Sequence, residues 1–330
     1  MNNVLVTGGA GFIGSHVCDA LLARNDAVIC VDDFNDYYDP KIKKNNIANC
    51  LNNPKFKLSI IDIRAFGKLK EIFLKNKIDK IIHLAARTGV RASLKNPFLY
   101  EGTNLRGTIN LLELAKEFKI KNFIFGSSSS VYGINKKIPF SETDSADSPI
   151  SPYAATKESC ELMCHTYHHI YGLKITCLRL FTVYGPRGRP DMAPYKFTRL
   201  INEGKEIERY GNGSSKRDYT YVSDIVDGVI KALDKELDFE IINLGNSDAI
   251  ELNYFISLIE KSLGKKVKIK QIGAQPGDVP ITYADISKAK SLLDWEPKVK
   301  IEEGIEKFVE WFGENKKQGA KLILKKGLAQ

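Results

Sequence analysis

Tyr153 and Lys157 lie four residues apart in the segment Ser-Pro-Tyr-Ala-Ala-Thr-Lys at 151–157. This spacing places both side chains on one face of a helix, and Pro152 suits the first turn of that helix. A phenol ordinarily ionises near pH ~10, and a nearby ammonium ion favours the phenolate. A phenolate can take the proton of a hydroxyl group while hydride leaves the same carbon. We therefore predict Tyr153 and Lys157 as a catalytic pair, with an ordinary amphipathic helix pair as the alternative.

Four consecutive serines, 127–130, follow an apolar run that is typical of a strand and precede Val-Tyr-Gly at 131–133. Hydroxyl groups at the carboxyl end of a parallel strand face the crevice in which ligands bind. One of these serines could hold or relay the proton of the reacting hydroxyl group. The alternative is a polar turn, and the pattern does not rank the four serines.

Gly8, Gly11 and Gly14 stand between a predicted strand and a predicted helix, with the spacing G-x-x-G-x-x-G. Such a turn lets the backbone approach a pyrophosphate at the helix N-terminus. Asp32 ends the next apolar run and could accept hydrogen bonds from both hydroxyls of an adenosine ribose. Its charge would repel a 2′-phosphate, and Asp33 follows it, so NAD is predicted rather than NADP. A surface turn beside a surface aspartate is the alternative.

Further cofactor contacts are predicted where other strands end. Asp62 and Ile63 could meet the adenine, and small residues after the fourth strand leave room for the cofactor. Asn104 is expected at the start of a helix, where capping is an equally good role. The additional predicted cofactor residues are Phe12, Ile13, Asn35, Asp62, Ile63, Leu84, Ala85, Ala86 and Asn104.

The elements that position these residues alternate between short apolar runs and segments of helical period. Strands are predicted at 4–7, 27–31, 57–61, 80–84, 122–125 and 175–180, and helices at 14–24, 69–75 and 105–118. Repeated strand–helix–strand units predict an α/β fold, a doubly wound parallel sheet covered on both faces.

After residue 180 glycine and proline cluster, and the elements become shorter and mixed. Helices are predicted at 192–203, 223–234, 251–263 and 302–312, and strands near 241–244 and 267–271. The predicted first domain spans 1–180 with a return segment near 219–245. A second, smaller, mixed α/β domain is predicted over 181–330.

Composition excludes several classes of protein. Of 330 residues, 43% are hydrophobic and 27% are charged, which is too apolar for a disordered chain. No apolar run approaches the ~18 residues of a membrane span, and the first residues lack the pattern of a signal peptide, so a cytoplasmic protein is expected. The net charge is +9, but the basic residues are scattered, and no nucleic-acid partner is predicted.

Two groups of potential metal or redox ligands are given structural interpretations. The six cysteines include no Cys-x-x-Cys pair and are predicted to be reduced packing residues. His165, His168 and His169 have helical spacing, but no metal is predicted because the expected reaction needs none.

The glycine turn, the segment Ser-Ser-Ser-Ser-Val-Tyr-Gly and the Tyr153–Lys157 pair resemble the extended short-chain dehydrogenases/reductases that act on nucleotide sugars, from residue 1 to about 312. The resemblance implies a Rossmann domain bound to NAD and a smaller nucleotide-sugar domain. It implies a homodimer formed through helices near 98–118 and 153–171. Register with the family places the catalytic hydroxyl at Ser128, three residues before Val131.

Within that family the segments 83–91, 153–157, 179–192 and 275–285 resemble UDP-glucuronate 4-epimerases. Dehydratases of the family usually carry an Asp-Glu pair where this chain has Ser129 and Ser130, and reductases more often use NADPH. Arg87 departs from the epimerase branch, which usually has Gln there, and Thr88 and Ala92 depart as well. Epimerisation of UDP-galactose or a UDP-N-acetylhexosamine, a decarboxylase and an NAD(H)-sensing protein without catalysis remain alternatives.

The resemblance also implies a set of contacts to a UDP-sugar substrate. A 4-keto uronate can lose carbon dioxide, so the enzyme must hold its carboxylate, and Thr182, Arg189 and the serine turn are expected to do so. The implied substrate contacts are Arg91, Ser128, Ser129, Ser130, Thr182, Arg189, Lys196, Phe197, Tyr210, Arg217, Gln275 and Asp278.

Overall fold

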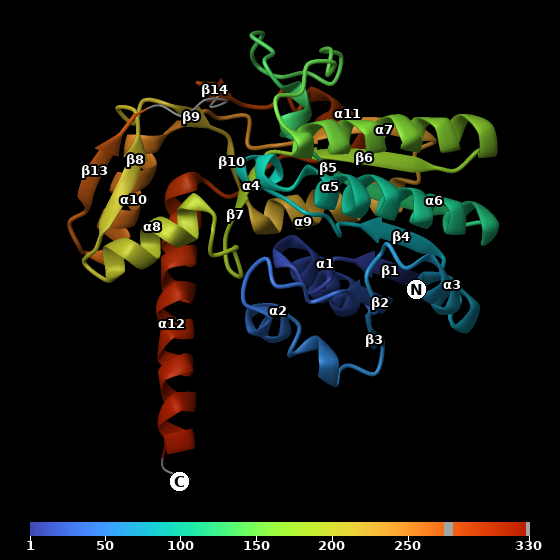
Figure 1. Cartoon of the computed structure of the whole chain (residues 1–330), viewed down its shortest axis with the longest axis horizontal. Coiled ribbons are helices and arrows are strands. Elements are labelled where there is room, and N and C mark those ends of the chain that lie inside the picture. Colours follow the sequence, from blue (N-terminus) through green and yellow to red (C-terminus); the bar gives the residue numbers. More distant parts are fainter. Residues whose placement is uncertain (274–279, 328–330) are drawn as a thin grey trace.

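A parallel sheet forms the centre of the computed structural model, which describes residues 1–273 and 280–327 (Figure 1). Its seven strands have the order β11-β6-β5-β4-β1-β2-β3. The strands are β1 (Asn3–Thr7), β2 (Ala27–Asp32), β3 (Phe56–Ile60), β4 (Lys80–His83), β5 (Asn122–Ser128), β6 (Ile175–Leu180) and β11 (Phe239–Leu244). Every strand predicted before residue 180 is present, and β5 extends further than expected, so that Ser127 and Ser128 end the strand instead of following it.

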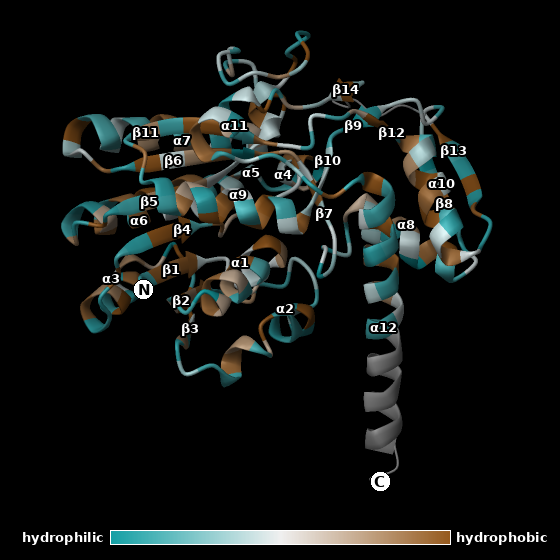
Figure 2. Cartoon of the chain, turned by 180° about the vertical axis from the view of Figure 1, so that it is seen from behind, coloured by the Kyte–Doolittle hydropathy of each residue, from teal (hydrophilic) through white to brown (hydrophobic). Residues whose placement is uncertain are grey.

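The apolar runs form strands because both faces of the sheet are covered. In β1, Val4 and Val6 belong to one hydrophobic core, whereas Leu5 belongs to the other. This alternation is the two-residue period of a strand, and strands buried on both faces are apolar throughout. The described strands of the sheet lie between helices in Figure 2, where hydrophobic residues concentrate along them.

Helices cover the sheet on two sides. On one side α1 (Phe12–Ala23) packs against α9 (Val222–Lys235), and on the other α6 (Gly107–Glu117) packs against α3 (Phe66–Lys75) and α7 (Pro152–Tyr171). The segment before α6 consists of α4 (Val90–Lys95), α5 (Pro97–Tyr100) and a π-helical stretch, Glu101–Arg106. Short helices occupy Pro40–Asn46 (α2), Cys50–Asn52 and Ser129–Tyr132. The prediction of a doubly wound α/β fold is confirmed.

The smaller, mixed α/β part is built mostly from residues after 184. Its helices are α8 (Ala193–Asn202), α10 (Leu252–Leu263) and α12 (Ile301–Gly327), whereas α11 (Ser287–Leu293) packs against α9 and β11 of the larger part. Strand β8 (Glu206–Tyr210) pairs with β13 (Lys268–Ile272), and β9 (Lys216–Arg217) lies between β12 (Ile250–Glu251) and β14 (Ile281–Thr282). Strands β7 (Thr182–Tyr184) and β10 (Tyr219–Tyr221) pair with each other at the junction with the sheet. Helix α12 starts against α10 and runs away from the rest of the chain (Figure 1).

The chain returns to the large sheet through α9 and β11, and β11 pairs with β6 along its whole length. The numerical boundaries of the two domains stay a prediction. Within residues 1–273 and 280–327, no helix combines the length and apolar character needed to cross a bilayer.

The register of the strands determines where the site lies. Thr7 at the end of β1 pairs with Val31 of β2 and His83 of β4, and Ser128 pairs with Leu180 at the end of β6. The carboxyl ends of these strands therefore meet at one edge of the sheet, which is where ligands bind in open α/β folds.

Candidate active site

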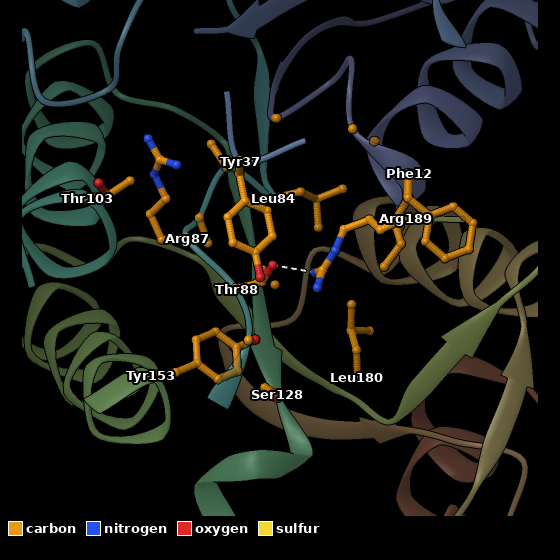
Figure 3. A pocket seen from close by; sticks show the side chains of 18 of the residues that line it. Phe12, Tyr37, Leu84, Arg87, Thr88, Thr103, Ser128, Tyr153, Leu180 and Arg189 are labelled. Atoms are coloured by element: carbon orange, nitrogen blue, oxygen red, sulfur yellow. Dashed lines mark hydrogen bonds between the residues drawn. The ribbon is translucent and has the colours of Figure 1, made fainter. Parts of the chain in front are cut away.

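A cavity of about 400 Å³ opens at the carboxyl edge of the sheet (Figure 3). It brings together most of the predicted cofactor residues with the predicted catalytic residues. The predicted residues that line it are Gly8, Gly11, Phe12, Ile13, Gly14, Asp32, Asp33, Asn35, Asp62, Ile63, Leu84, Ala85, Ala86, Ser128, Ser129, Ser130, Tyr153, Lys157, Thr182 and Arg189.

The glycine turn forms a cradle that side chains would fill. Gly8 has a φ of +70°, and a Cβ there would lie 2.7 Å from the backbone nitrogen of Ala85. A Cβ on Gly14 would lie 2.1 Å from the carbonyl oxygen of Gly8. No side chain caps the N-terminus of α1, where Gly11 is the N-cap residue. The backbone amide groups of the first turn of α1 are therefore available to a ligand, and the glycine backbone beside them can be approached closely. Both features fit a pyrophosphate group.

Asp32 ends β2 beside this cradle and is 6% exposed. One of its carboxylate oxygens accepts a hydrogen bond from the amide of Phe34 at 2.9 Å, and the other accepts one from Ala10 at 3.2 Å. Lys43 of α2 lies 3.9 Å from the carboxylate. Burial raises the pKa of Asp32 and lowers the pKa of Lys43, while each charge partly offsets this effect on the other. The carboxylate is thus positioned rigidly at the place where an adenosine ribose is expected.

Asn104 differs from its predicted role. It lies inside the π-helical stretch Glu101–Arg106 instead of starting a helix, and it is not among the described residues that line the cavity. Its side-chain oxygen accepts a hydrogen bond from the amide of Arg87 at 2.8 Å, and its nitrogen donates to the Arg87 carbonyl at 3.0 Å and to Thr156 at 3.0 Å. Asn104 therefore holds the loop after β4 in place from behind the cavity wall.

The predicted reaction centre lies where α7 meets the end of β5. Ser151 caps α7 by accepting a hydrogen bond from the amide of Ala154 at 3.1 Å, and Pro152 occupies the first turn. Tyr153 points into the cavity toward the end of β5, where Ser128 lies (Figure 3). Lys157 is 4% exposed and donates to the carbonyl of Gly126 at 2.6 Å.

The four serines have different partners. Ser128 hydroxyl donates to the Ser130 hydroxyl at 3.2 Å, and both line the cavity with Ser129. Ser127 instead donates to Glu161 of α7 at 2.5 Å. Glu161 is held in turn by Arg179 of β6 at 2.7 Å, and both side chains are 4% exposed. This buried pair ties the ends of β5 and β6 to the helix that carries Tyr153.

His83, at the end of β4, links two elements beside the cavity through hydrogen bonds. Thr108 donates to the carbonyl of Asn104 at 2.6 Å, so its oxygen accepts from Nε2 of His83 at 2.9 Å, and Nδ1 of His83 accepts from Thr7 at 2.7 Å. Burial, and then the charge of Lys157, lower the pKa of His83 to about 3. A neutral His83 therefore joins the end of β1 to the start of α6.

Arg189 enters the cavity from the loop after β7, and this loop is anchored on α1. His16 of α1 hydrogen-bonds the carbonyl of Pro186 at 2.9 Å, and Arg187 pairs with Asp19 at 2.7 Å. Asp191 accepts hydrogen bonds from Nε and Nη2 of Arg189 at 3.0 and 2.7 Å. The remaining guanidinium nitrogen of Arg189, Nη1, donates to Thr88 (Figure 3).

Other predicted substrate residues lie away from the described lining of the cavity. Phe197 packs into the hydrophobic core and is not among the described lining residues, so its implied contact with the substrate stays a prediction. The guanidinium carbon of Arg91, which follows lining residue Val90, lies 4.3 Å from the ring centre of Tyr210. Lys196 lies 3.9 Å from Glu208, and Arg217 donates to the carbonyl of Lys216 at 2.8 Å. Gln275 and Asp278 fall outside the described residues.

Several cavity residues were not predicted. The loop after β2 contributes Tyr37, whose hydroxyl donates to Asp191 at 3.4 Å. Its position in the loop that follows Asp32 at the carboxyl edge was the available signal. The other lining residues that were not predicted include Tyr38, Lys43, Arg87, Thr88, Thr103, Leu180, Phe181 and Met192. Among the described residues, no group of His, Cys, Asp and Glu side chains is arranged to hold a metal ion.

Comparison with known proteins agrees with the site. The family described as GDP-mannose 4,6 dehydratase matches residues 5–308. A UDP-glucuronate 4-epimerase of Thermodesulfobacterium geofontis is 48% identical over 316 residues, which cover 96% of this chain and 97% of that protein.

Solved structures of UDP-sugar epimerases are also similar. The UDP-glucuronic acid 4-epimerase of Bacillus cereus, in complex with UDP-glucuronic acid and NAD, is 38% identical, with a TM-score of 0.87 over 94% of this chain and 99% of that chain. The UDP-glucose 4-epimerase of Thermotoga maritima with UDP-glucose is 35% identical, with a TM-score of 0.88 over 95% and 99%. The chain belongs to the GDP-mannose 4,6 dehydratase family of extended short-chain dehydrogenases/reductases, and its similar relatives there include UDP-sugar 4-epimerases.

Proposed function

We propose that the chain is an NAD-dependent UDP-sugar 4-epimerase whose substrate is UDP-glucuronate, with UDP-galacturonate as the product. The observation that carries this proposal is that Tyr153, Ser128 and Arg189 face one cavity that also contains the glycine cradle. The relatives named as UDP-glucuronate 4-epimerases support the choice of substrate.

The cavity suits NAD because its donors and acceptors match the parts of that molecule. The uncapped start of α1 and the cradle of Gly8 and Gly14 would take the pyrophosphate. Asp32 would accept hydrogen bonds from the adenosine ribose, and its charge together with Asp33 opposes a 2′-phosphate. When bound, NAD would take hydride from C4 of the sugar and later return it.

Tyr153, Lys157 and Ser128 would handle the proton. Tyr153 as phenolate takes the proton of the 4-hydroxyl group and gives it back to the 4-keto oxygen in the second half of the cycle. Ser128 would hold the same oxygen, and Lys157 supplies positive charge on the same face of α7. The 4-keto sugar must turn within the cavity between the two steps so that hydride returns to its opposite face.

Dehydration is disfavoured by the distribution of acids. The carboxylates among the described lining residues are Asp32 at the end of β2, Asp33 directly after it, and Asp62 in the loop after β3. The segment beside Tyr153 presents the serines 128–130 instead. Elimination of water needs an acid and a base beside the sugar carbons, so hydride return without elimination is the better interpretation.

Arg189 would make the cavity suitable for a uronate. A 4-keto uronate carries its carboxylate beta to a ketone and loses carbon dioxide readily, which destroys the negative charge. A cation beside the carboxylate stabilises the charged form and so opposes this loss. Nε and Nη2 of Arg189 both donate hydrogen bonds to Asp191. Nη1, which donates to Thr88, is therefore the nitrogen that would contact a substrate.

The test is incubation of the purified protein with UDP-glucuronate, UDP-glucose and UDP-N-acetylglucosamine, with products identified by NMR. UDP-glucuronate should give UDP-galacturonate, and Tyr153→Phe should lose turnover while keeping UDP-sugar binding. Arg189→His should release decarboxylated UDP-pentose, whereas Arg199→His, at an exposed position of α8, should not. Turnover of UDP-glucose or UDP-N-acetylglucosamine alone would replace the proposed substrate, and retained activity in Tyr153→Phe would refute the mechanism.

A further inference from the structure

Arg87 is a basic residue among the described residues that line the cavity, and the proposed reaction gives it no role. The basic lining residues are Lys43, Arg87, Lys157 and Arg189. Lys43 lies beside Asp32, Arg189 pairs with Asp191, and Lys157 stands on the same helix face as Tyr153. Arg87 donates from Nη1 to the neutral side chain of Asn35 at 3.2 Å, and no ion pair joins it to a carboxylate of the described chain.

Hydrogen bonds to its backbone fix the position of Arg87. It follows β4, and both its amide and its carbonyl are hydrogen-bonded to the buried side chain of Asn104. The backbone is therefore fixed, and the side chain spans the cavity from the loop after β4 to Asn35 in the loop after β2. Figure 3 shows the guanidinium turned toward Thr103 and away from Tyr153.

Electrostatic effects place the charge of Arg87 near the end of β3. Hydrogen bonds from Arg64 lower the pKa of Asp62, and the charge of Arg87 contributes to the same lowering. Arg64 already pairs with Asp62 at 2.5 Å, so Asp62 does not depend on Arg87 as a partner. Asn35, Asp62 and Ile63 form the part of the cavity expected to receive adenosine, whereas the pyrophosphate cradle at Gly11 lies between the end of β1 and the start of α1.

We propose that Arg87 is a cofactor-positioning residue that closes over the adenosine half of bound NAD, with its planar guanidinium against the adenine ring. The floor of this half contains the apolar side chains of Ile61 and Ile63, which leaves the opposite face of a flat base to be covered. A guanidinium stacks well on an aromatic face and also keeps its edge free for hydrogen bonds, as with Asn35. The inference rests on the proposed function only in taking NAD as the cofactor.

The experiment measures binding rather than turnover. The cofactor is removed, and NAD, ADP-ribose, AMP and nicotinamide mononucleotide are titrated by calorimetry into the native protein and into Arg87→Gln, Arg87→Lys and Arg106→Gln. Arg106 is exposed on the neighbouring helical stretch and does not line the cavity, so its variant is the matched control. Thermal unfolding of each variant without ligand verifies that the fold is kept.

Arg87→Gln should weaken NAD, ADP-ribose and AMP about tenfold, the effect expected for loss of one stacking partner, and should leave nicotinamide mononucleotide unchanged. Arg87→Lys should recover only a small part, because an ammonium ion lacks the planar face. Unchanged AMP affinity in Arg87→Gln, or complete recovery in Arg87→Lys, would overturn the proposal. Failure of the native protein to epimerise any UDP-sugar would refute the proposed function without altering these titrations.

Discussion

The buried pair of Glu161 and Arg179 provides a prediction whose size follows from the contacts. Glu161 accepts hydrogen bonds from Nε and Nη2 of Arg179 at 3.0 and 2.7 Å and from Ser127 at 2.5 Å. The guanidinium of Arg179 also lies 4.7 Å from the ring centre of Tyr132. Glu161→Gln keeps the shape of the side chain but leaves the charge of Arg179 buried without its hydrogen-bonded counter-charge.

Removing one partner of a buried ion pair costs about 3–5 kcal/mol. An unfolding entropy of about 2.1 cal/mol/K per residue, applied to 330 residues, converts this loss into a fall in Tm of roughly 4–7 °C. Glu71→Gln is the control, because Glu71 forms an exposed pair with Lys75 on α3. Exposed pairs contribute about 0–1 kcal/mol, so the control should change the Tm by less than ~2 °C.

Differential scanning calorimetry of the apo protein measures both variants. The double variant Glu161→Leu, Arg179→Met should regain most of the loss, because apolar side chains of similar size leave neither charge uncompensated. A fall in Tm for Glu161→Gln no larger than that of the control would refute the reasoning. So would a double variant less stable than Glu161→Gln, since it would show that the pair stabilises the fold beyond mutual neutralisation.

Three further predictions concern the cradle, the pH dependence and the assembly. Gly14→Ala should weaken NAD binding at least tenfold in a fluorescence titration with little change in circular dichroism, because its Cβ would lie 2.1 Å from a carbonyl oxygen of the turn; native affinity would contradict the cradle. Burial lowers the pKa of His83 from 6.5 to about 3, so the fold requires the neutral ring. The contribution of the neutral ring to the free energy of unfolding is present above pH 6.5 and is lost as the pH falls toward 3. Urea unfolding at pH 7 and pH 4 should therefore show a smaller acid-induced loss in His83→Gln than in the native protein, and equal losses would count against the assignment. If the predicted homodimer forms through the helices near 98–118 and 153–171, Leu162→Glu on α7, where Leu162 is 64% exposed, should yield monomers in light scattering; an unchanged mass would exclude this face.

The sequence predicts the sheet and much of the cofactor end of the cavity because both depend on local pattern. Continuous apolar runs identify parallel strands, and the carboxyl ends of such strands necessarily meet at one edge. Gly8, Asp32 and Asp62 each follow or end such a run, so their convergence could be anticipated without knowing a single contact. Asn104 was assigned less well because π-helical geometry leaves no signature in residue type, and its amide is used by Arg87.

The sugar end could not be predicted in the same way, because it is formed by loops that meet across the chain. Tyr37 and Asp191 are 154 residues apart, and Arg189 and Thr88 are 101 apart. No periodicity fixes such a meeting, which depends on anchors such as His16 at Pro186. The family resemblance led us to expect a substrate contact at Arg189, but only the coordinates place Asp191 against two of its three nitrogens.

Arg87 and Arg189 illustrate why residue type alone leaves the chemistry of a cavity incomplete. Both present a guanidinium to the same space, yet Asp191 neutralises most of the charge of Arg189, while Arg87 donates to the neutral amide of Asn35 and forms no ion pair within the described chain. The freer cation therefore lies at the end proposed for the cofactor, and the partly neutralised cation lies at the end proposed for the sugar. This order suits the proposed cycle, in which NAD takes hydride and later returns it, whereas the sugar must release its contacts, turn and bind again. A fully charged Arg189 would hold the carboxylate of the sugar more tightly and would oppose that turn, so Asp191 is as much a part of the substrate end as the arginine it accompanies.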